Sequence, residues 1–308
     1  MKLTFDLRRN LGENPTAFAL QMAWIGQCIR ALPEWEFSLL ITEGDEDIVT
    51  PVAGGTQVIS AANPFWPFWA NRVKWPRVLR SIKTDTLLSF SPSPIRGFGK
   101  QLELTTERLV QLPGKPQLGE KQVFSEWELD TLRESFTQGK PYFLYFPDNR
   151  DEADLSIALK AFSIFKKWNQ SNYKLVMVMD KVGQKAHKVR FQSYKYREDV
   201  ELIEDDAFLE REKWIAGSLA LVLDPQTVGY VFLATLAAEQ AIPLIAPLPL
   251  SFPLAFFETN TRNETALGDA LNRIYSSEGK AAFQSFATPE NTVSYWEGFR
   301  NLIEKPIA

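Results

Sequence analysis

The residues best suited to binding an anion lie in two polar segments that follow apolar, strand-like runs. Arg150 stands in PDNRDEAD, directly after YFLYF, and Thr227, Gly229 and Tyr230 follow LALVLD in the stretch DPQTVGYVFLATLAAEQ. A guanidinium group binds phosphate through charge-assisted hydrogen bonds. Backbone N–H groups at the start of a helix also favour an anion, and Gly229 has no side chain to obstruct a ligand. These residues predict a site for a phosphorylated ligand.

Two candidates in this region also have a structural interpretation. Arg150 lies among Asp148, Asp151 and Glu152, so a surface ion pair is the alternative to phosphate binding. Glu239 stands near the end of the helix-like run VGYVFLATLAAEQ, where it could hydrogen-bond to ligand hydroxyl groups. The alternative for Glu239 is a solvated helix end.

The composition argues against several other kinds of site. The chain has one histidine, His187, and one cysteine, Cys28, so neither a metal cluster of these residues nor an internal disulfide is expected. Its 34 lysines and arginines against 38 aspartates and glutamates give a net charge of −4, which argues against nucleic-acid binding. Phosphate-loop, dinucleotide and serine-nucleophile motifs do not occur in the sequence. We therefore expect no metal and no cofactor.

The sequence predicts a cytoplasmic protein. The opening MKLTFDLRRN has no apolar run typical of a signal peptide. The most apolar region, residues 241–257, contains four prolines and so does not predict a membrane-spanning helix. A single cysteine fits a reducing compartment.

One segment suggests contact with the inner face of a membrane. NPFWPFWANRVKWPRVLR places Trp66, Trp69 and Trp75 among arginines and a lysine. Aromatic rings beside cations are typical of membrane interfaces. Tryptophans buried in an ordinary core are the alternative.

The elements that must position these residues alternate between strands and helices. Strand-like runs such as MKLTFDL, EFSLLIT, YFLYF, KLVMVMD, LALVLD and IPLIAP are separated by amphipathic, helix-like stretches, including residues 16–32. This alternation indicates parallel α/β sheets. The turn-rich stretch RLVQLPGKPQLGEKQV precedes a short helix, after which the α/β pattern restarts. We predict two domains, residues 1–138 and 139–308.

The second half resembles the nucleotide-sugar domain of GT-B glycosyltransferases of the retaining, group-1 type. KPYFLYF, KLVMV and LVLDP are similar to that family's strands, Gly229-Tyr230 matches its Gly-Phe, and residues 242–244 match its Thr-Pro-Val. In the first half, DLRRNLGENPTAFALQM resembles the glycine loop and first helix, and TVSYWEGFRNLIEK resembles the C-terminal helix that returns to the first domain. The resemblance implies two facing Rossmann-like domains, the N-terminal one abbreviated, around a nucleotide-sugar cleft.

The resemblance also assigns a role to the loop after the first strand. In the family, the loop corresponding to Gly12, Glu13 and Asn14 faces the donor and the acceptor. A plain connecting loop is the alternative.

The chain departs from the family where the chemistry is expected. Val228 and Leu236 occupy the positions of two carboxylates, and Glu152 and Ala153 those of an Arg-Lys pair that neutralises the diphosphate. Glu239, one turn after Leu236, could replace the second carboxylate. We expect a nucleoside diphosphate to bind through backbone donors, and sugar transfer that is slow or absent.

The resemblance suggests a role in bacterial surface-polysaccharide or glycoconjugate assembly. If active, the protein would be a hexosyltransferase-type enzyme that uses a nucleotide-sugar donor. The alternative is a non-catalytic relative that acts as a binding or scaffold partner of other glycosyltransferases. A small-molecule-binding α/β protein of other specificity is a third interpretation.

Overall fold

A computed structural model shows that the chain forms two compact α/β units, each described here by itself. The first comprises Met1–Gly119 with Asn291–Ala308, and the second comprises Glu120–Glu290. The structure describes residues 1–8, 15–42, 56–61, 74–90, 95, 98–104, 108–109, 112, 123–146, 152–179, 191–204, 211–224, 230–247, 256–276 and 292–304.

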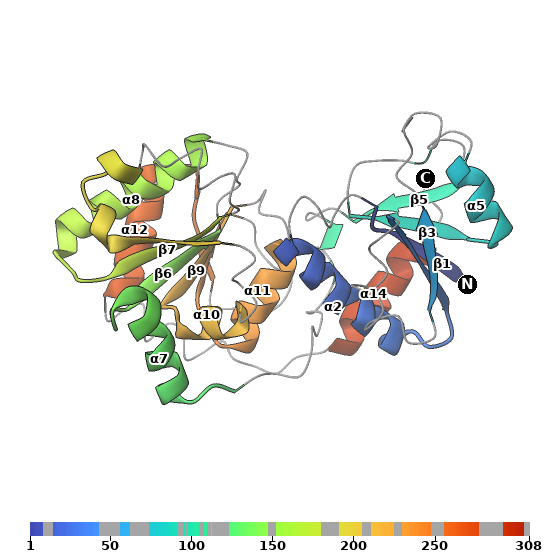
Figure 1. Ribbon diagram of the computed structural model, residues 1–308, viewed down its shortest axis with the longest axis horizontal. Helices are drawn as coiled ribbons and strands as arrows, with labels where there is room; N and C mark the ends of the chain where they lie inside the picture. The colour runs from blue at the N-terminus through green and yellow to red at the C-terminus, as the bar shows by residue number, and fades with distance from the viewer. Residues whose placement is uncertain are drawn as a thin grey trace. The chain divides into compact units, whose positions relative to one another are not determined.

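The first unit contains a five-stranded parallel sheet in the order β3-β2-β1-β4-β5. Its strands are β1 (Lys2–Asp6), β2 (Glu36–Thr42), β3 (Gln57–Ala61), β4 (Thr86–Ser89) and β5 (Lys100–Glu103), and its helices are α2 (Pro15–Ala31), α5 (Trp75–Ser81) and α14 (Thr292–Glu304). In Figure 1, α2 and α14 lie side by side next to this sheet. The strand order is that of a Rossmann-like domain.

The C-terminal helix α14 therefore belongs to the first unit, although it follows the second unit in sequence. The indole N–H of Trp24 in α2 donates a 3.0 Å hydrogen bond to the hydroxyl of Tyr295 in α14. The rings of Trp24 and Phe299 meet edge to face, with their centroids 5.0 Å apart. Lys100 of β5 donates to the Ile303 carbonyl of the same helix.

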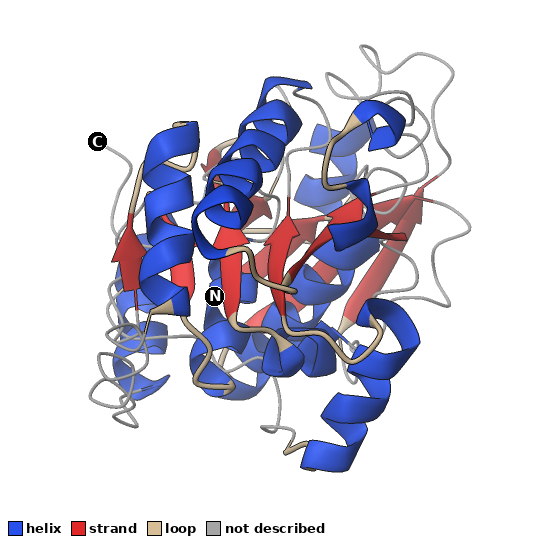
Figure 2. Ribbon diagram, turned by 90° about the vertical axis from the view of Figure 1, so that its left-hand side faces the viewer, coloured by secondary structure: helices blue, strands red, loops and turns tan. Residues whose placement is uncertain are grey.

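The second unit contains a six-stranded parallel sheet in the order β11-β10-β9-β6-β7-β8. Its strands are β6 (Tyr142–Phe146), β7 (Lys174–Met179), β8 (Val200–Glu204), β9 (Ala220–Leu223), β10 (Leu244–Ala246) and β11 (Phe256–Glu258), and its helices are α7 (Glu126–Thr137), α8 (Glu152–Asn169), the 3-10 turn η2 (Arg197–Asp199), α10 (Arg211–Gly217), α11 (Tyr230–Glu239) and α12 (Glu264–Tyr275). Figure 2 shows the strands between helices. This is also the Rossmann order.

Helix α7 packs within the second unit, so the units divide between Gly119 and Glu120, whereas the sequence placed the boundary near residue 138. The ring centroids of Phe136 in α7 and Trp214 in α10 lie 4.5 Å apart. The Arg133 side chain of α7 donates a hydrogen bond to the Gly217 carbonyl. The helix begins with a capping box, in which Ser125 and Glu128 each bond to the other's backbone N–H.

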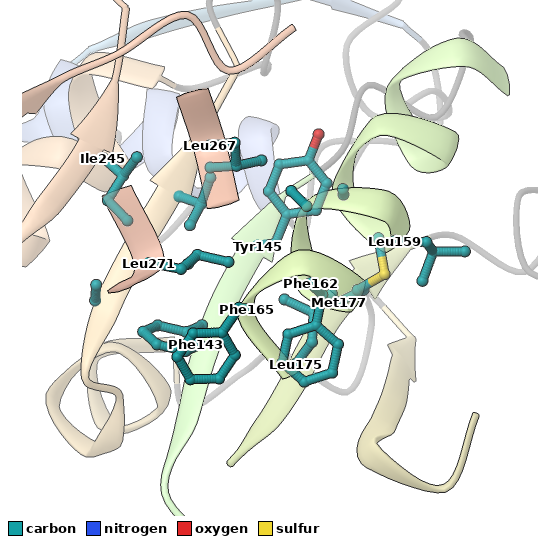
Figure 3. Close-up of a cluster of buried hydrophobic side chains, with 14 of the residues drawn as sticks. Phe143, Tyr145, Leu159, Phe162, Phe165, Leu175, Met177, Ile245, Leu267 and Leu271 are labelled. Carbon is teal, nitrogen blue, oxygen red and sulfur yellow. The ribbon is translucent and has the colours of Figure 1, made fainter. Parts of the chain in front are cut away.

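The largest core cluster lies between the second sheet and the helices α8 and α12 (Figure 3). Its labelled side chains come from β6, β7 and β10 on one side and from the two helices on the other: Phe143, Tyr145, Leu175, Met177 and Ile245, and Leu159, Phe162, Phe165, Leu267 and Leu271. In Figure 1, α7, α10 and α11 cover the opposite face of this sheet. No helix in the described part of the chain is both long and apolar enough to span a membrane.

The close approach of α8 and α12 depends on the absence of a side chain at Gly268. A Cβ atom there would lie 3.1 Å from Ile164 Cγ2 and 3.3 Å from the Ala161 carbonyl oxygen. Gly268→Leu is therefore expected to lower the free energy of unfolding by about 1–3 kcal/mol, the usual cost of overpacking. Urea denaturation followed by circular dichroism measures the loss.

A matched control for Gly268→Leu is Ala266→Leu, because Ala266 is partly exposed on the same helix. The control is expected to change the free energy of unfolding by less than about 0.5 kcal/mol. Equal stability of Gly268→Leu and the wild type would contradict the tight packing of α8 against α12.

Candidate functional site

The strand order of each sheet points to the place where a ligand would bind. In a Rossmann-like sheet, ligands bind beyond the carboxyl ends of the strands at the point where the strand order reverses. In the second unit this point lies between β6 and β9, where Phe146 pairs with Leu223. In the first unit it lies between β1 and β4, where Asp6 pairs with Ser89.

An aspartate, Asp224, stands directly after β9 at the switch point of the second unit, and it is almost completely buried, with 1% of its side chain exposed. The Thr261 hydroxyl donates to its Oδ2 atom over 3.3 Å. The Arg262 guanidinium donates from Nε to Oδ2 at 3.3 Å and from Nη2 to Oδ1 at 3.4 Å. These bonds tie the end of β9 to the connection between β11 and α12.

Arg262 and Thr261 were not predicted from the sequence as site residues. Nothing in TNTRNET resembles a binding motif, and residue 262 is 38 positions from Asp224. The available signal was an aspartate that ends the buried run LALVLD, since a carboxylate at such a position needs a partner. The Arg262 side chain remains 41% exposed and brings a cation to the edge of the sheet where an anionic ligand is expected.

Helix α11 begins at Tyr230, and all of its side chains from Tyr230 to Ala237 are buried. Thr235 uses its hydroxyl to donate to the Val231 carbonyl within the helix. Leu236, for which the sequence resemblance predicted the position of a second carboxylate, is 3% exposed. Within the described part of α11, the first two turns therefore present apolar side chains to their surroundings.

Glu239 and Tyr230 lie at opposite ends of α11. They are nine positions apart, which corresponds to about 14 Å along the helix axis. The chain then turns back, since the N–H of Ile242 bonds to the Ala237 carbonyl just before β10 begins. Glu239 is thus near the amino end of a strand, away from the carboxyl edge that holds Asp224.

Most of the other predicted site residues lie outside the described part of the chain. These are Arg150, Thr227 and Gly229 in the second unit and Gly12, Glu13 and Asn14 in the first. Val228, His187, Trp66 and Trp69 also lie outside it. Of the residues predicted to bind a nucleotide-sugar, Tyr230 and Glu239 are described.

The switch point of the first unit holds a second carboxylate–guanidinium pair. Asp6, 5% exposed, receives hydrogen bonds from Arg8 Nε to Oδ1 at 2.8 Å and from Arg8 Nη2 to Oδ2 at 2.7 Å. The Arg8 guanidinium lies 4.7 Å from the ring centroid of Trp75, a cation–π contact. Asp6, Arg8 and Trp75 thus form one cluster at the carboxyl end of β1, which we call the Asp6 cluster.

The burial of Trp75 bears on the predicted membrane contact. Its side chain is 2% exposed and packs against Leu40, Leu79 and Leu87. Trp75 is therefore a core residue, as in the alternative interpretation of its segment. Among the described residues, no three or more histidines, cysteines, aspartates or glutamates are grouped so that they could hold a metal ion.

Comparison with solved structures identifies the same fold in two glycosyltransferases and in a protein solved with UDP. A glycosyltransferase from Rickettsia africae matches with a TM-score of 0.65 and 8% identity, over 98% of this chain and 97% of that one. WaaG, a glycosyltransferase involved in lipopolysaccharide biosynthesis, matches with a TM-score of 0.63 and 13% identity, over 99% and 100%. The complex of S. aureus MnaA with UDP matches with a TM-score of 0.59 and 10% identity, over 98% and 95%.

These likenesses confirm the predicted α/β fold of two Rossmann-like domains, as found in GT-B glycosyltransferases. At identities of 8–13%, they establish the fold alone. No protein-family model matches the sequence. No curated protein matches it either.

Proposed function

We propose that this protein is a glycosyltransferase-like protein that binds a nucleotide-sugar. The observation that carries the proposal is the match of nearly the whole chain to nearly the whole of two glycosyltransferase structures. The S. aureus MnaA structure, which also matches nearly the whole chain, contains UDP. This supports a nucleoside diphosphate as the ligand.

The proposed site lies at the carboxyl edge of the second sheet. Backbone N–H groups at Thr227, Gly229 and Tyr230 would donate to the phosphates at the start of α11. Arg262, held by Asp224, would supply guanidinium N–H donors in place of the Arg-Lys pair that Glu152 and Ala153 replace. Arg150, which follows β6 in the sequence, would supply another.

The process that we propose is bacterial surface-polysaccharide or glycoconjugate assembly, in which WaaG, one of the matched structures, is itself involved. The corresponding location is the cytoplasm or the inner membrane face. Any transfer would be slow or absent, because Leu236 is an apolar, buried residue where the family has a carboxylate. The same observation favours the second candidate function, a non-catalytic binding or scaffold partner of other glycosyltransferases.

UDP or another nucleoside diphosphate is expected to bind with micromolar to millimolar affinity. Gly229→Asp is expected to abolish this binding, because both its side chain and its negative charge oppose a phosphate at the start of α11. Isothermal titration calorimetry with UDP, GDP and ADP measures the affinity. A thermal-shift assay supplies an independent test, since a ligand that favours the folded state raises the midpoint.

Gly99→Asp is the matched control for Gly229→Asp. A Cβ atom at Gly99 would meet no heavy atom within 4 Å, so the same change of charge and size is tolerated there. This variant should bind UDP like the wild type. Normal binding by a folded Gly229→Asp protein, or no binding of any nucleoside diphosphate by the wild type, would refute the proposed site. Turnover of a UDP- or GDP-sugar at about 1 per second would refute slow transfer.

A further inference from the structure

The Asp6 cluster has more cationic and N–H groups than the carboxylate beside it can satisfy. Lys74, the residue before α5, places its ammonium group 4.9 Å from the ring centroid of Trp75. Arg8 lies 4.7 Å from the same centroid. Two positive charges therefore surround one indole ring, and Asp6 balances the charge of Arg8 alone.

The charge of Lys74 is not balanced by the described part of the chain, where no carboxylate lies within ion-pair distance of it. Its side chain is partly exposed, so an ion can reach it from solvent. Asp6, at 5% exposure, instead accepts three hydrogen bonds from Arg8, one from its backbone N–H and two from its guanidinium group. Together with Lys74, the Asp6 cluster thus contains two cations and one carboxylate.

The Trp75 indole N–H provides a second, independent observation. The side chain is 2% exposed, and its Nε1 atom has no hydrogen-bond partner among the residues that the structure describes. A buried donor without an acceptor bears its full desolvation cost, so such groups are rare in folded proteins. Both observations concern the surroundings of the Trp75 ring, and an anionic oxygen beside the ring would serve the unpaired donor and the unbalanced charge together.

We infer that the Asp6 cluster binds the anionic group of an acceptor molecule, either a phosphate or a carboxylate. An anionic oxygen near Trp75 would accept from its N–H and balance the charge of Lys74, while Asp6 keeps Arg8 in place. The cluster lies at the carboxyl end of β1, at the switch point where Rossmann-like sheets bind ligands. The inference rests on the proposed function, because a glycosyltransferase-like protein would bind an acceptor in addition to the nucleotide-sugar.

The test follows the Trp75 N–H directly in the full-length protein. The chain has nine tryptophans, so protein labelled with 15N-tryptophan gives at most nine indole signals, and a Trp75→Phe variant identifies that of Trp75. Glucose 6-phosphate, glucuronate and glucose are titrated separately. Glucose 6-phosphate or glucuronate should shift the Trp75 signal in a saturable way. The compound that binds more tightly shows whether the site prefers a phosphate or a carboxylate. Glucose should leave the signal in place.

Lys74→Gln should lower the affinity for the more tightly bound anion at least about tenfold, as expected for loss of a charge-assisted hydrogen bond. Arg77→Gln is the matched control, because Arg77 is exposed on the same helix. It should leave the affinity unchanged. A Trp75 signal that moves with neither anion, or equally with glucose, would overturn the inference. So would unchanged affinity in a folded Lys74→Gln protein.

The anion site and the nucleotide site can be tested independently of each other. In a Gly229→Asp background, the anion should still shift the Trp75 signal, because the two sites lie in different units. Binding of UDP with no anion effect at Trp75 would refute the anion site alone. An anion effect without any nucleotide binding would refute the nucleotide proposal and retain the anion site.

Discussion

Trp24→Ala is expected to lower the free energy of unfolding of the first unit by about 3–5 kcal/mol, the usual cost of removing a buried aromatic side chain. Trp24 is fully buried, and its ring meets Phe5, Phe90 and Phe299 edge to face, with centroids 6.1, 5.7 and 5.0 Å away. No other residue of α2 is described with so many aromatic contacts.

Part of this loss comes from Tyr295, whose hydroxyl accepts the hydrogen bond from Trp24. Burial raises the pKa of the Tyr295 phenol, so its hydroxyl stays protonated and needs a partner. Because Tyr295 lies in α14, the variant should also release this helix from α2. Urea denaturation gives the stability, and hydrogen exchange of residues 292–304 reports on α14 separately.

Trp127→Ala is the control for Trp24→Ala. Trp127 lies on α7 and is 75% exposed, so the same substitution there should change the stability by less than about 0.5 kcal/mol. A loss below about 1 kcal/mol for Trp24→Ala would show that α14 is not held through this ring. Unchanged exchange of residues 292–304 would show the same.

Leu236→Glu, which introduces a carboxylate where the sequence resemblance predicts one, is expected to destabilise the second unit by about 3–5 kcal/mol rather than create activity. Leu236 is 3% exposed in a run of eight buried residues, Tyr230–Ala237. A carboxylate without a partner in such surroundings costs as much as breaking a buried ion pair. Urea denaturation measures the loss of stability, and calorimetry with UDP measures any change in affinity.

Ala238→Glu provides a matched control for Leu236→Glu, because Ala238 is partly exposed two residues further along α11. Its effect should stay within about 0.5 kcal/mol. If Leu236→Glu were as stable as the wild type and bound UDP more tightly, position 236 would line the nucleotide site. The scaffold candidate would then lose its main support.

The central strands of both sheets were predictable from the sequence because they are buried on both faces. Runs such as YFLYF, KLVMVM and ALVL form β6, β7 and β9, and their apolar residues are nearly inaccessible to solvent. The short helix after the turn-rich stretch was predicted as well, and the structure shows that it begins with a capping box between residues three apart, Ser125 and Glu128.

Three strands were not predicted, and all three lie at sheet edges. These are β3 (QVISA), β5 (KQLE) and β11 (FFE). An edge strand pairs on one side only, and it is often short and polar. Its sequence therefore contains little of the apolar pattern on which prediction depends.

The sequence by itself determined that the chain forms two parallel α/β sheets, because the alternation of buried strands and amphipathic helices is a local property. Only the tertiary structure brought Asp224 to Arg262 and Arg8 to Trp75. These partners are 38 and 67 positions apart and meet because parallel topology gathers the carboxyl ends of distant strands at one edge. Such contacts leave no periodic trace in the sequence, so the partner of Asp224 and the ring beside Arg8 were decided by the fold.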